Sequence, residues 1–557
     1  MHLRQLNGPA GAARARATRG PGARPLPARS LTRARVISAP VPPLQQEQQP
    51  QPYRVTEETV RDVRSMYKSL LYEYDYEVQP DWVEGSIPSD LVGTYFRNGP
   101  GLQVNTGKTQ RHTFDGDGMV LSFSFDGTPA VRFKNKFVRT KGFVDEQNCA
   151  NTGVVAWGGR MYALYESGLP HELDPATLST LGESTVGGQL ETPVLAAHYR
   201  VVTDPATGAR DWVAFSSNAG LRGTELIFYE FDAERGRQRG TPARLQLPAG
   251  MALVHDIAVT EDYYVVHLGP LDFDGARFVT DYITSRCSIA ECLRYRPDKP
   301  SRVWFVPRPR GAAAGAAPLS IEAPPAFVFH HANAFQTRMQ DGRTLVTLDT
   351  VAWDTIAFET NQYTLSPDYY AGGPRTQLRR YVFDLTRGAL ASDSRLMRRC
   401  CEFPSVDPAA NAAAHRAVYC CADIVDDDLH WGPAQSVARV SVDPAAGLDG
   451  PVDPSAVTLD VWSPGRRCIM NEPLFVPRKG ATAPDDGYVL VAVHDAATGK
   501  GSLAILDASR LAAGPVATIR LPHILPAGLH GSFSEAVFHE GSEALPKWVE
   551  PTPIRQI

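Results

Sequence analysis

The sequence predicts an all-β fold, a β-propeller built from many short strands, on three observations. Gly 46 and Pro 45 in 557 residues make the chain rich in turn-forming residues, and 43% hydrophobic residues suffice for a large core. From about residue 90 onward, short apolar runs such as RMYALYE, TLVTLDT and YVLVAVHD are separated by Asp–Gly, Gly–Gly and Asp–Pro steps. Helical periodicity is rare there. Because roughly 450 residues of short strands exceed a single sandwich, we expect four-stranded blades around an axis, although no visible repeat sets their number.

The first part of the chain has a different composition. Residues 1–46 contain no acidic residue, and their arginines stand among Ala, Pro, Ser and Thr. This composition is typical of an organellar transit peptide and lacks the apolar core of a secretory signal; the alternative is a disordered basic tail. We therefore predict a leader and linker over residues 1–50, a plastid location with the cytoplasm as the alternative, and one folded domain over residues 51–557.

One helix is predicted directly after the Pro/Gln-rich linker of residues 40–54. Apolar residues recur at helical spacing from Val60 to Leu71, and Thr56 is a suitable N-cap. We expect this helix to pack on the outside of the main body. The segment RGAAAGAAP (residues 310–318) is expected to be a surface loop.

Charge and cysteine usage exclude several functions. The net charge is −5 and the pI is about 6.3, so nothing favours nucleic-acid binding. The eight cysteines contain no CxxC spacing, which argues against a zinc ribbon, and are interpreted as buried thiols of a reducing compartment. No run of about 18 apolar residues predicts a transmembrane helix.

Four of the fourteen histidines lie in or beside apolar, strand-like segments. They are His198 in LAAHYRVV, His255 in ALVHDIAV, His330 in FVFHHANAF and His530 in GLHGSFS. A buried imidazole costs free energy unless its nitrogens are bonded, and metal ligation would satisfy one of them. The spacings, 57 (255 − 198), 75 (330 − 255) and 200 (530 − 330), match no local motif but suit ligands from different blades. By spacing alone, dispersed structural or solvated histidines are the more common explanation.

Three carboxylates have similarly apolar surroundings: Glu166 in MYALYESGLP, Glu402 in RCCEFPSV and Glu472 in MNEPLFVPR. Paired with imidazole N–H groups, they would fix each histidine's tautomer and direct the other nitrogen toward a metal. The alternative is a buried salt bridge to an arginine such as Arg399 or Arg478.

Together these segments resemble the carotenoid cleavage oxygenase family. The matching stretches are DLVGTYFRNGPG, HTFDGDGMV, NKFVRTKGFV, ALYESGLPHELDP, AECLRYRPDKP, FVFHHANAF, RCCEFP and NEPLFVPR. They occur in family order from about residue 80 to the end of the chain.

The resemblance implies a seven-bladed β-propeller with a capping dome of loops and short helices. It also implies iron(II) on the propeller axis, with His198, His255, His330 and His530 as ligands and Glu166, Glu402 and Glu472 as their hydrogen-bonding partners. His331 does not match a ligand. With three glutamates for four histidines, one ligand relies on other contacts.

The implied reaction is dioxygenation: O2 cleaves a carbon–carbon double bond of a carotenoid or apocarotenoid and yields two carbonyl products. The alkene supplies the electrons, so no nicotinamide is required, and no protein acid or base is needed beyond the metal ligands. The substrate pocket is implied to be apolar and aromatic, with Thr152, Tyr165, Phe329 and Phe403 near the metal. The alternative for the three aromatic residues is ordinary core packing.

The chain departs from the family at one place. A long, partly apolar insertion that follows the NKFVRTKGFVDEQ segment in the cyanobacterial relative is absent here, where only Cys149 and Ala150 separate Asn148 from Asn151. That insertion serves peripheral membrane contact, so the substrate entrance is expected to differ. The loop TLSPDYYAGGP (364–374), with Tyr369 and Tyr370, could cover it, or these tyrosines could be surface aromatics.

Other functions remain open on the same residues. A dioxygenase of this fold can cleave stilbene-type phenolic alkenes, binding the phenol with tyrosine and lysine; Lys134 and Lys136 lie in a suitable segment but do not discriminate. The fold also serves retinoid isomerases. A non-catalytic propeller scaffold is disfavoured because all four histidines and all three glutamates are present.

Overall fold

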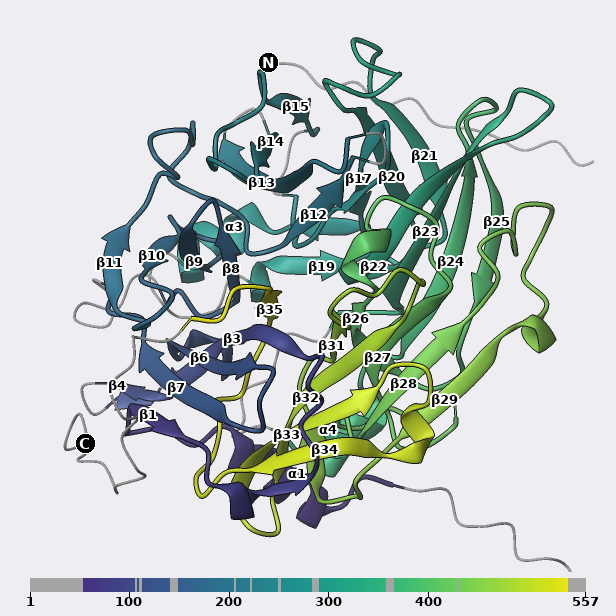
Figure 1. Cartoon of the computed structure of the whole chain (residues 1–557). Helices are drawn as coiled ribbons and strands as arrows, with labels where there is room; N and C mark the ends of the chain where they lie inside the picture. Colours follow the sequence, from purple (N-terminus) through teal and green to yellow (C-terminus); the bar gives the residue numbers. More distant parts are fainter. Residues whose placement is uncertain are drawn as a thin grey trace, which may run out of the picture. The chain divides into compact units, whose positions relative to one another are not determined.

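The computed structural model describes residues 54–538, apart from residues 106–107, 110–112, 141–148, 205–206, 221–222, 249–251, 283–289, 357–364 and 428–429. The predicted leader, residues 1–50, lies outside the described residues, and its boundary with the folded domain stays a prediction. The described strands form seven sheets of four to six strands arranged around a common centre, together with two two-stranded hairpins (Figure 1). The all-β, seven-bladed propeller is therefore confirmed.

We number the blades from first to seventh around the ring. For each blade, the strands are named in their spatial order from one edge of the sheet to the other. The first is β1 (Tyr74–Glu77), β7 (Val131–Phe137), β6 (Asp117–Asp126), β3 (Val92–Leu102) and β35 (Gly531–Ser534). The second is β11 (Thr180–Glu183), β10 (His171–Leu173), β9 (Arg160–Leu164) and β8 (Gly153–Trp157). The third is β12 (Tyr199–Thr203), β13 (Arg210–Gly220), β14 (Gly223–Asp232) and β15 (Ala243–Gln246). The fourth is β16 (Ala258–Val259), β17 (Tyr263–Leu268), β20 (Ser301–Pro307) and β21 (Leu319–Ala323).

The remaining blades come from the second half of the chain. The fifth is β22 (Phe327–Arg338), β23 (Thr344–Trp353), β24 (Thr376–Asp384) and β25 (Ala389–Arg395). The sixth is β26 (Cys401–Ser405), β27 (Ala417–Ala422), β28 (Ser436–Ser441) and β29 (Thr458–Trp462). The seventh is β2 (Val83–Gly85), β34 (Pro515–Arg520), β33 (Lys500–Asp507), β32 (Gly487–Asp495) and β30 (Cys468–Met470), with β31 (Leu474–Pro477) also paired to β32. The hairpins are β4 (Val104–Asn105) with β5 (Lys108–Thr109), and β18 (Leu271–Phe273) with β19 (Leu293–Tyr295).

Helices are few and short in the described residues. They are α1 (Glu57–Met66), α3 (Gly275–Arg277), α4 (Pro367–Gly372), η1 (Pro80–Trp82), η2 (Thr113–Asp115), η3 (Phe278–Tyr282), η4 (Ala290–Cys292), η5 (Pro408–Ala410), η6 (Pro454–Ala456) and η7 (Leu511–Ala513). Loops and short helices are the element types predicted for the capping dome. Among the helices that the structure describes, none has the length and apolarity needed to span a membrane.

Both ends of the folded chain close the ring. The late strand β35 pairs with β3 in the first blade, and the early strand β2 pairs with β34 in the seventh. Strands from opposite ends of the sequence therefore complete each other's blades, which leaves no open gap between the first and the last sheet.

Seven buried apolar clusters lie between neighbouring blades, one for each junction of the ring. Because successive strand residues point to opposite faces, each inner strand serves two junctions. Cys420 thus packs with the fifth blade and its neighbour Cys421 with the seventh. Both thiols are buried and free, as expected for the cysteines, and such continuous packing gives the ring a rigid centre.

The predicted N-terminal helix is present but shorter than its apolar pattern. Thr56 caps α1 by accepting a hydrogen bond from the backbone N–H of Thr59, and the apolar face of α1 packs against Tyr370 and Ile469. The predicted continuation through Leu71 is wrong. The N–H of Leu70 donates to the carbonyl of Gly101 at 2.7 Å, so the chain joins the edge of β3 instead of completing another helical turn.

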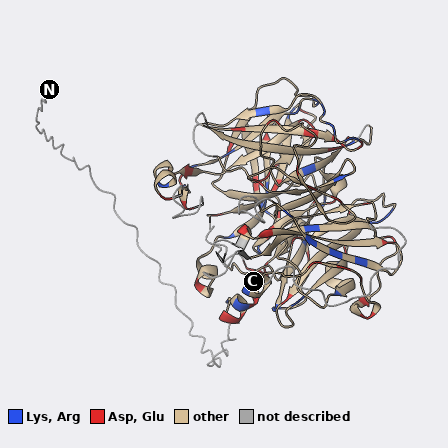
Figure 2. Cartoon of the chain, turned by 90° about the vertical axis from the view of Figure 1, so that its left-hand side faces the viewer, with Lys and Arg blue, Asp and Glu red and all other residues tan. Residues whose placement is uncertain are grey.

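The surface of the propeller carries both signs of charge. Acidic and basic residues are intermixed over the described part of the chain (Figure 2). Residues 310–318 form no helix or strand and are largely exposed, which confirms the predicted surface loop.

Candidate metal centre

The four predicted histidines converge at the centre of the propeller. His198 and His530 directly precede β12 and β35. His255 lies shortly before β16, and His330 lies within β22. One imidazole nitrogen from each lies within 4.8 Å of the others. These segments come from the third, fourth, fifth and first blades, which explains why the residues are so far apart in sequence.

Irregularities in the strands direct two of the site residues toward the centre. The β22–β23 ladder shifts register on both sides of His331, and the β26–β27 ladder shifts between Glu402 and Ser405. Such bulges re-aim side chains that a regular strand would point elsewhere. Phe403 sits in the second bulge at φ 53°, a left-handed conformation that a phenylalanine rarely adopts and that is often retained at functional sites.

Three of the four histidines are hydrogen-bonded to the three predicted glutamates. The Nδ1 atoms of His255, His330 and His530 lie 2.6, 2.5 and 2.8 Å from Glu166, Glu402 and Glu472. A carboxylate beside Nδ1 accepts a hydrogen bond from Nδ1–H, so that the proton stays on Nδ1 and Nε2 keeps its free electron pair. The pairs differ in solvent access, because the side chain of Glu166 is 39% exposed, whereas Glu402 and Glu472 are 18% and 12% exposed.

Among the described residues, no glutamate is hydrogen-bonded to His198, the fourth histidine. Its Nε2 lies 2.9 Å from Nε2 of His255. Burial, followed by the positive charge that the neighbouring histidines can carry, holds the pKa of His198 well below its usual value. The imidazole is therefore neutral at neutral pH, the form in which histidine binds metals.

The arrangement fits a divalent transition metal. Two nitrogens that each bind one ion at about 2.1 Å can lie about 3 Å apart, which agrees with the 2.9 Å between His198 and His255, and all four ligand nitrogens lie within 4.8 Å of one another. Nε2 of His330 is buried and has no hydrogen-bond partner among the described residues, and a metal would satisfy it. Four imidazoles suit iron, zinc, copper or nickel, so the donor set alone does not select the element.

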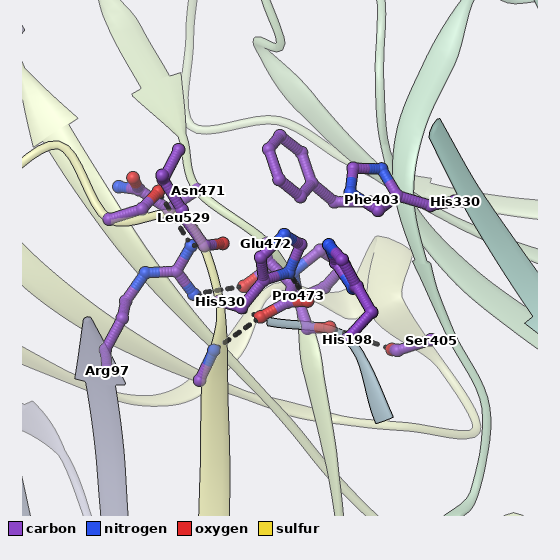
Figure 3. Close-up of polar contacts among 12 residues, drawn as sticks. Arg97, His198, His330, Phe403, Ser405, Asn471, Glu472, Pro473, Leu529 and His530 are labelled. Carbon is purple, nitrogen blue, oxygen red and sulfur yellow. Dashed lines mark hydrogen bonds and ion pairs between the residues drawn. The ribbon is translucent and has the colours of Figure 1, made fainter. Parts of the chain in front are cut away.

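Aromatic side chains border the cluster on one side. The ring of Phe403 stacks on His330 with centroids 5.2 Å apart and lies 5.3 Å from His530 (Figure 3). Phe329 contacts His255 edge-to-face at 5.0 Å. Both residues thus lie at the candidate metal, as predicted for pocket walls.

Of the other two predicted pocket residues, Thr152 contacts a site histidine through its backbone, and Tyr165 adjoins Glu166 in sequence. The carbonyl of Thr152 accepts from the N–H of His530 at 3.1 Å, while its hydroxyl donates to Asn151. Tyr165 precedes Glu166 and forms a β-bridge with Leu195. Burial and nearby acidic groups raise the pKa of its phenol, which stays neutral. The substrate-binding role of all four residues stays a prediction.

The alternative salt bridges from the three glutamates to Arg399 or Arg478 are not present among the described residues. Arg399 donates to the carbonyls of Asp423 and Ile424, and Arg478 pairs with Asp486 and Asp507. An arginine does approach Glu472, but it is Arg97, at 3.7 Å, which sequence reasoning did not single out.

A tryptophan in the site was also not predicted. The indole N–H of Trp353 donates to Glu402 at 2.6 Å. Trp353 ends a strand of the fifth blade, and no local pattern marks it as a partner of a carboxylate in the sixth. Arg97 does have a signal, since it lies in the FRNGPG stretch that carries part of the family resemblance.

The two lysines considered for phenol binding are engaged elsewhere. Nζ of Lys134 bonds to the carbonyl of Ala176 and lies 3.2 Å from Asp75, and Nζ of Lys136 bonds to Ser179.

The region of the predicted entrance is described only in part, because residues 141–148 and residue 364 lie outside the described residues. Tyr370 is buried, and Tyr369 and Tyr370 both pack on Trp431 at 5.2 Å, within the cluster that holds α1. The interpretation as a surface aromatic is therefore wrong for Tyr370, while Tyr369 is half-buried and also anchors α4 to the body of the propeller. That the loop covers the entrance stays a prediction.

Comparison with known proteins agrees with this architecture. The family described as retinal pigment epithelial membrane protein matches residues 67–535. The apocarotenoid-15,15'-oxygenase of Synechocystis is 33% identical over 84% of this chain and 95% of its own length. Isoeugenol monooxygenase of Pseudomonas putida is 30% identical over 81% and 93%. The crystal structure of the cobalt-substituted Synechocystis enzyme superimposes with a TM-score of 0.75 at 31% identity, covering 87% of this chain and 100% of that one.

Proposed function

This chain belongs to the family of the retinal pigment epithelial membrane protein and the carotenoid cleavage oxygenases, and from that premise we propose that it is an iron(II) dioxygenase that cleaves a double bond of a carotenoid or apocarotenoid. The observation that carries the proposal is the convergence of four histidines on the axis, three of them backed by glutamates. A non-catalytic scaffold would not need to keep this complete set.

We propose His198, His255, His330 and His530 as the metal ligands. Iron(II), when bound, supplies a redox-active ion with open coordination positions for dioxygen chemistry. The glutamates hold the imidazoles in one tautomer and return negative charge to the site without occupying a ligand position. Both atoms of one O2 appear in two carbonyl products, so the balance requires no further reductant.

The aromatic rings have a role that follows from their position. Phe403 and Phe329 present apolar surface beside His330 and His255, where a polyene can pack and from which water is excluded. Thr152 is tied to the backbone of His530, and we propose that its side chain borders the substrate on the side of the second blade.

Cleavage of phenolic alkenes is the second candidate, favoured by the similarity to isoeugenol monooxygenase and, at 27% identity, to a lignostilbene dioxygenase of Sphingomonas paucimobilis. The higher identity to the apocarotenoid oxygenase, 33% against 30% and 27%, supports the polyene as the preferred substrate.

A substrate panel tests the proposal. Purified protein loaded with iron(II) is expected to consume oxygen and to convert a polyene aldehyde into two shorter carbonyl compounds, identified by mass spectrometry. Metal-free protein serves as the control. Intact apocarotenoids together with cleaved stilbenes or isoeugenol would establish the second candidate in place of the first, and no turnover of any alkene by iron-loaded protein would refute both.

For residues 1–50 we propose a transit peptide that directs the chain to a plastid. The support is compositional: arginine-rich, without an acidic residue before Glu47. Residues 1–50 fused to a fluorescent protein are expected to enter plastids, and fluorescence that stays in the cytoplasm would contradict the proposal.

A further inference from the structure

We infer that Arg97 is a positioning residue that sets His530 and Glu472 for metal binding. The inference rests on the proposed metal-binding function of the four histidines. It concerns a residue of β3 that no ligand or pocket assignment includes.

Arg97 is buried and surrounded by groups of the metal centre. Its side chain is 1% exposed, and its guanidinium lies 3.7 Å from the carboxylate of Glu472 (Figure 3). It is the only arginine paired with one of the three glutamates in the described part of the chain. A buried cation and anion in contact neutralise each other, so the carboxylate can remain charged at low solvent exposure.

The guanidinium also binds the backbone that carries the histidine. Its Nη2 donates to the carbonyls of Gly528 and Leu529 at 3.0 and 2.9 Å, and its Nη1 donates to the carbonyl of Glu472 at 3.1 Å. The guanidinium of Arg97 thus joins the two residues before His530 to Glu472, which accepts the hydrogen bond from Nδ1–H of His530. The fixed fork of an arginine can make these bonds at once, whereas a lysine ammonium offers only a point charge.

The remaining backbone groups of this segment are held by neighbours of Arg97. Asn98 accepts from the N–H of Leu529 and donates its own N–H to the carbonyl of His530, at 2.8 and 3.0 Å. The amide of Asn98 bonds to the carbonyls of Ala150 and Gly153, on either side of Thr152. Strand β3 therefore also fixes the segment that carries His530. Without Arg97, the buried carbonyl of Gly528 and the half-buried carbonyl of Leu529 would lose this hydrogen-bond donor.

Gly528 provides an independent indication. A Cβ atom at this position would lie 2.0 Å from Nε of Arg97 and 2.6 Å from its Cδ. The guanidinium occupies the space of a side chain, so Gly528 is required by the position of Arg97 and not by a turn.

The chain contains a matched control. Arg380 is fully buried, forms a two-pronged pair with Asp349 at 2.8 Å, and donates to the carbonyls of Asp443 and Ala446. It has the same chemistry as Arg97 but joins the fifth and sixth blades, and the histidine that bonds to its partner Asp349 is His415, which is not one of the four converging histidines. Arg380→Lys therefore reports the cost of disturbing a buried arginine without touching the metal centre.

The test compares Arg97→Lys, Arg97→Met, Gly528→Ala and Arg380→Lys with the wild-type protein, using cobalt(II) as the probe. Affinity comes from metal titration, the ligand set from the cobalt absorption spectrum, and stability from thermal unfolding without metal. We expect Arg97→Met and Gly528→Ala to weaken cobalt binding about 10- to 100-fold with an altered spectrum, and Arg97→Lys to weaken it less. Arg380→Lys should lower the melting temperature but keep the affinity and spectrum.

Each outcome is decisive. Wild-type affinity and spectrum in Arg97→Met or in Gly528→Ala would overturn the inference while leaving the metal site intact. If the Arg97 variants do not fold, Gly528→Ala decides, because it keeps the arginine and displaces it. Failure of the wild-type chain to bind cobalt(II) or iron(II) would overturn the proposed function, and this inference with it.

Discussion

The buried histidines of the propeller fall into two groups with different surroundings. Those on the axis, His198, His255, His330 and His530, converge on one another, and three are hydrogen-bonded to a glutamate. Off the axis, His267, His331 and His494 are at least as buried, have no carboxylate hydrogen-bonded to the ring among the described residues, and do not converge. Burial lowers the pKa of these three to about 4, about 3 and about 4. His415 is also buried off the axis; its ring bonds to Asp349 at 2.9 Å, but it belongs to no cluster of histidines in the described part of the chain. Burial therefore makes an imidazole neutral, but convergence and a carboxylate make it a candidate ligand.

The largest loss of metal affinity is expected at His330, and the contrast with its neighbour His331, which does not converge on the site, is the sharpest test. His330→Ala removes a converging nitrogen and should reduce metal affinity by at least about 100-fold, beyond the usual cost of losing a hydrogen-bonding partner of a ligand. His331→Gln, one residue further along β22, should keep a full complement of metal. Metal content after dialysis, measured by mass spectrometry, checks both. A metal-replete His330→Ala protein, or a metal-free His331→Gln protein, would break the distinction between the two groups.

A smaller difference in metal affinity is expected between substitutions of Glu472, the least exposed of the three glutamates, and Glu166, the most exposed. Glu472→Gln places an amide at a carboxylate site that is 12% exposed and faces Arg97, which loses its counter-charge. Glu166→Gln changes a side chain that is 39% exposed, where water can take over the hydrogen bond. We expect metal affinity to fall about 10- to 100-fold for Glu472→Gln and to stay near the lower limit for Glu166→Gln. Metal titration of both variants decides, and the reverse order would show that solvent access does not set the strength of these pairs.

The smallest effect on metal binding is expected at an off-axis histidine, where replacement should change stability and its pH dependence instead. His494 is 4% exposed, bonds to Ser65 of α1 at 2.7 Å, and has its pKa lowered to about 4 by burial. The unfolded chain takes up the proton near pH 6.5, so the stability present above that pH is lost as the pH falls through about 4, up to about 3 kcal/mol. His494→Phe should make the free energy of unfolding less dependent on pH between 6.5 and 4, with unchanged metal affinity. Denaturant unfolding across this range measures it; an unchanged slope would mean that the ring is protonated in the folded protein.

Much of the fold followed from local patterns. Short apolar runs and turn residues predicted the strands, and an N-cap with helical periodicity predicted α1. The end of α1 could not be predicted, because the hydrogen bond between Leu70 and Gly101 depends on a strand about 30 residues away. The seven histidine and glutamate candidates were found from their apolar context and family segments, and all seven lie at the centre.

The sequence by itself determined which residues are suited to a metal centre and that the chain forms a propeller, because residue chemistry and strand periodicity are local properties. Only the tertiary structure decided how these residues meet. The bulges at His331 and Glu402 aim the side chains, the blade order pairs each glutamate with its histidine, and Arg97 joins both ends of the ring at His530. Contacts between residues hundreds of positions apart depend on the closing of the ring, and no local pattern encodes it.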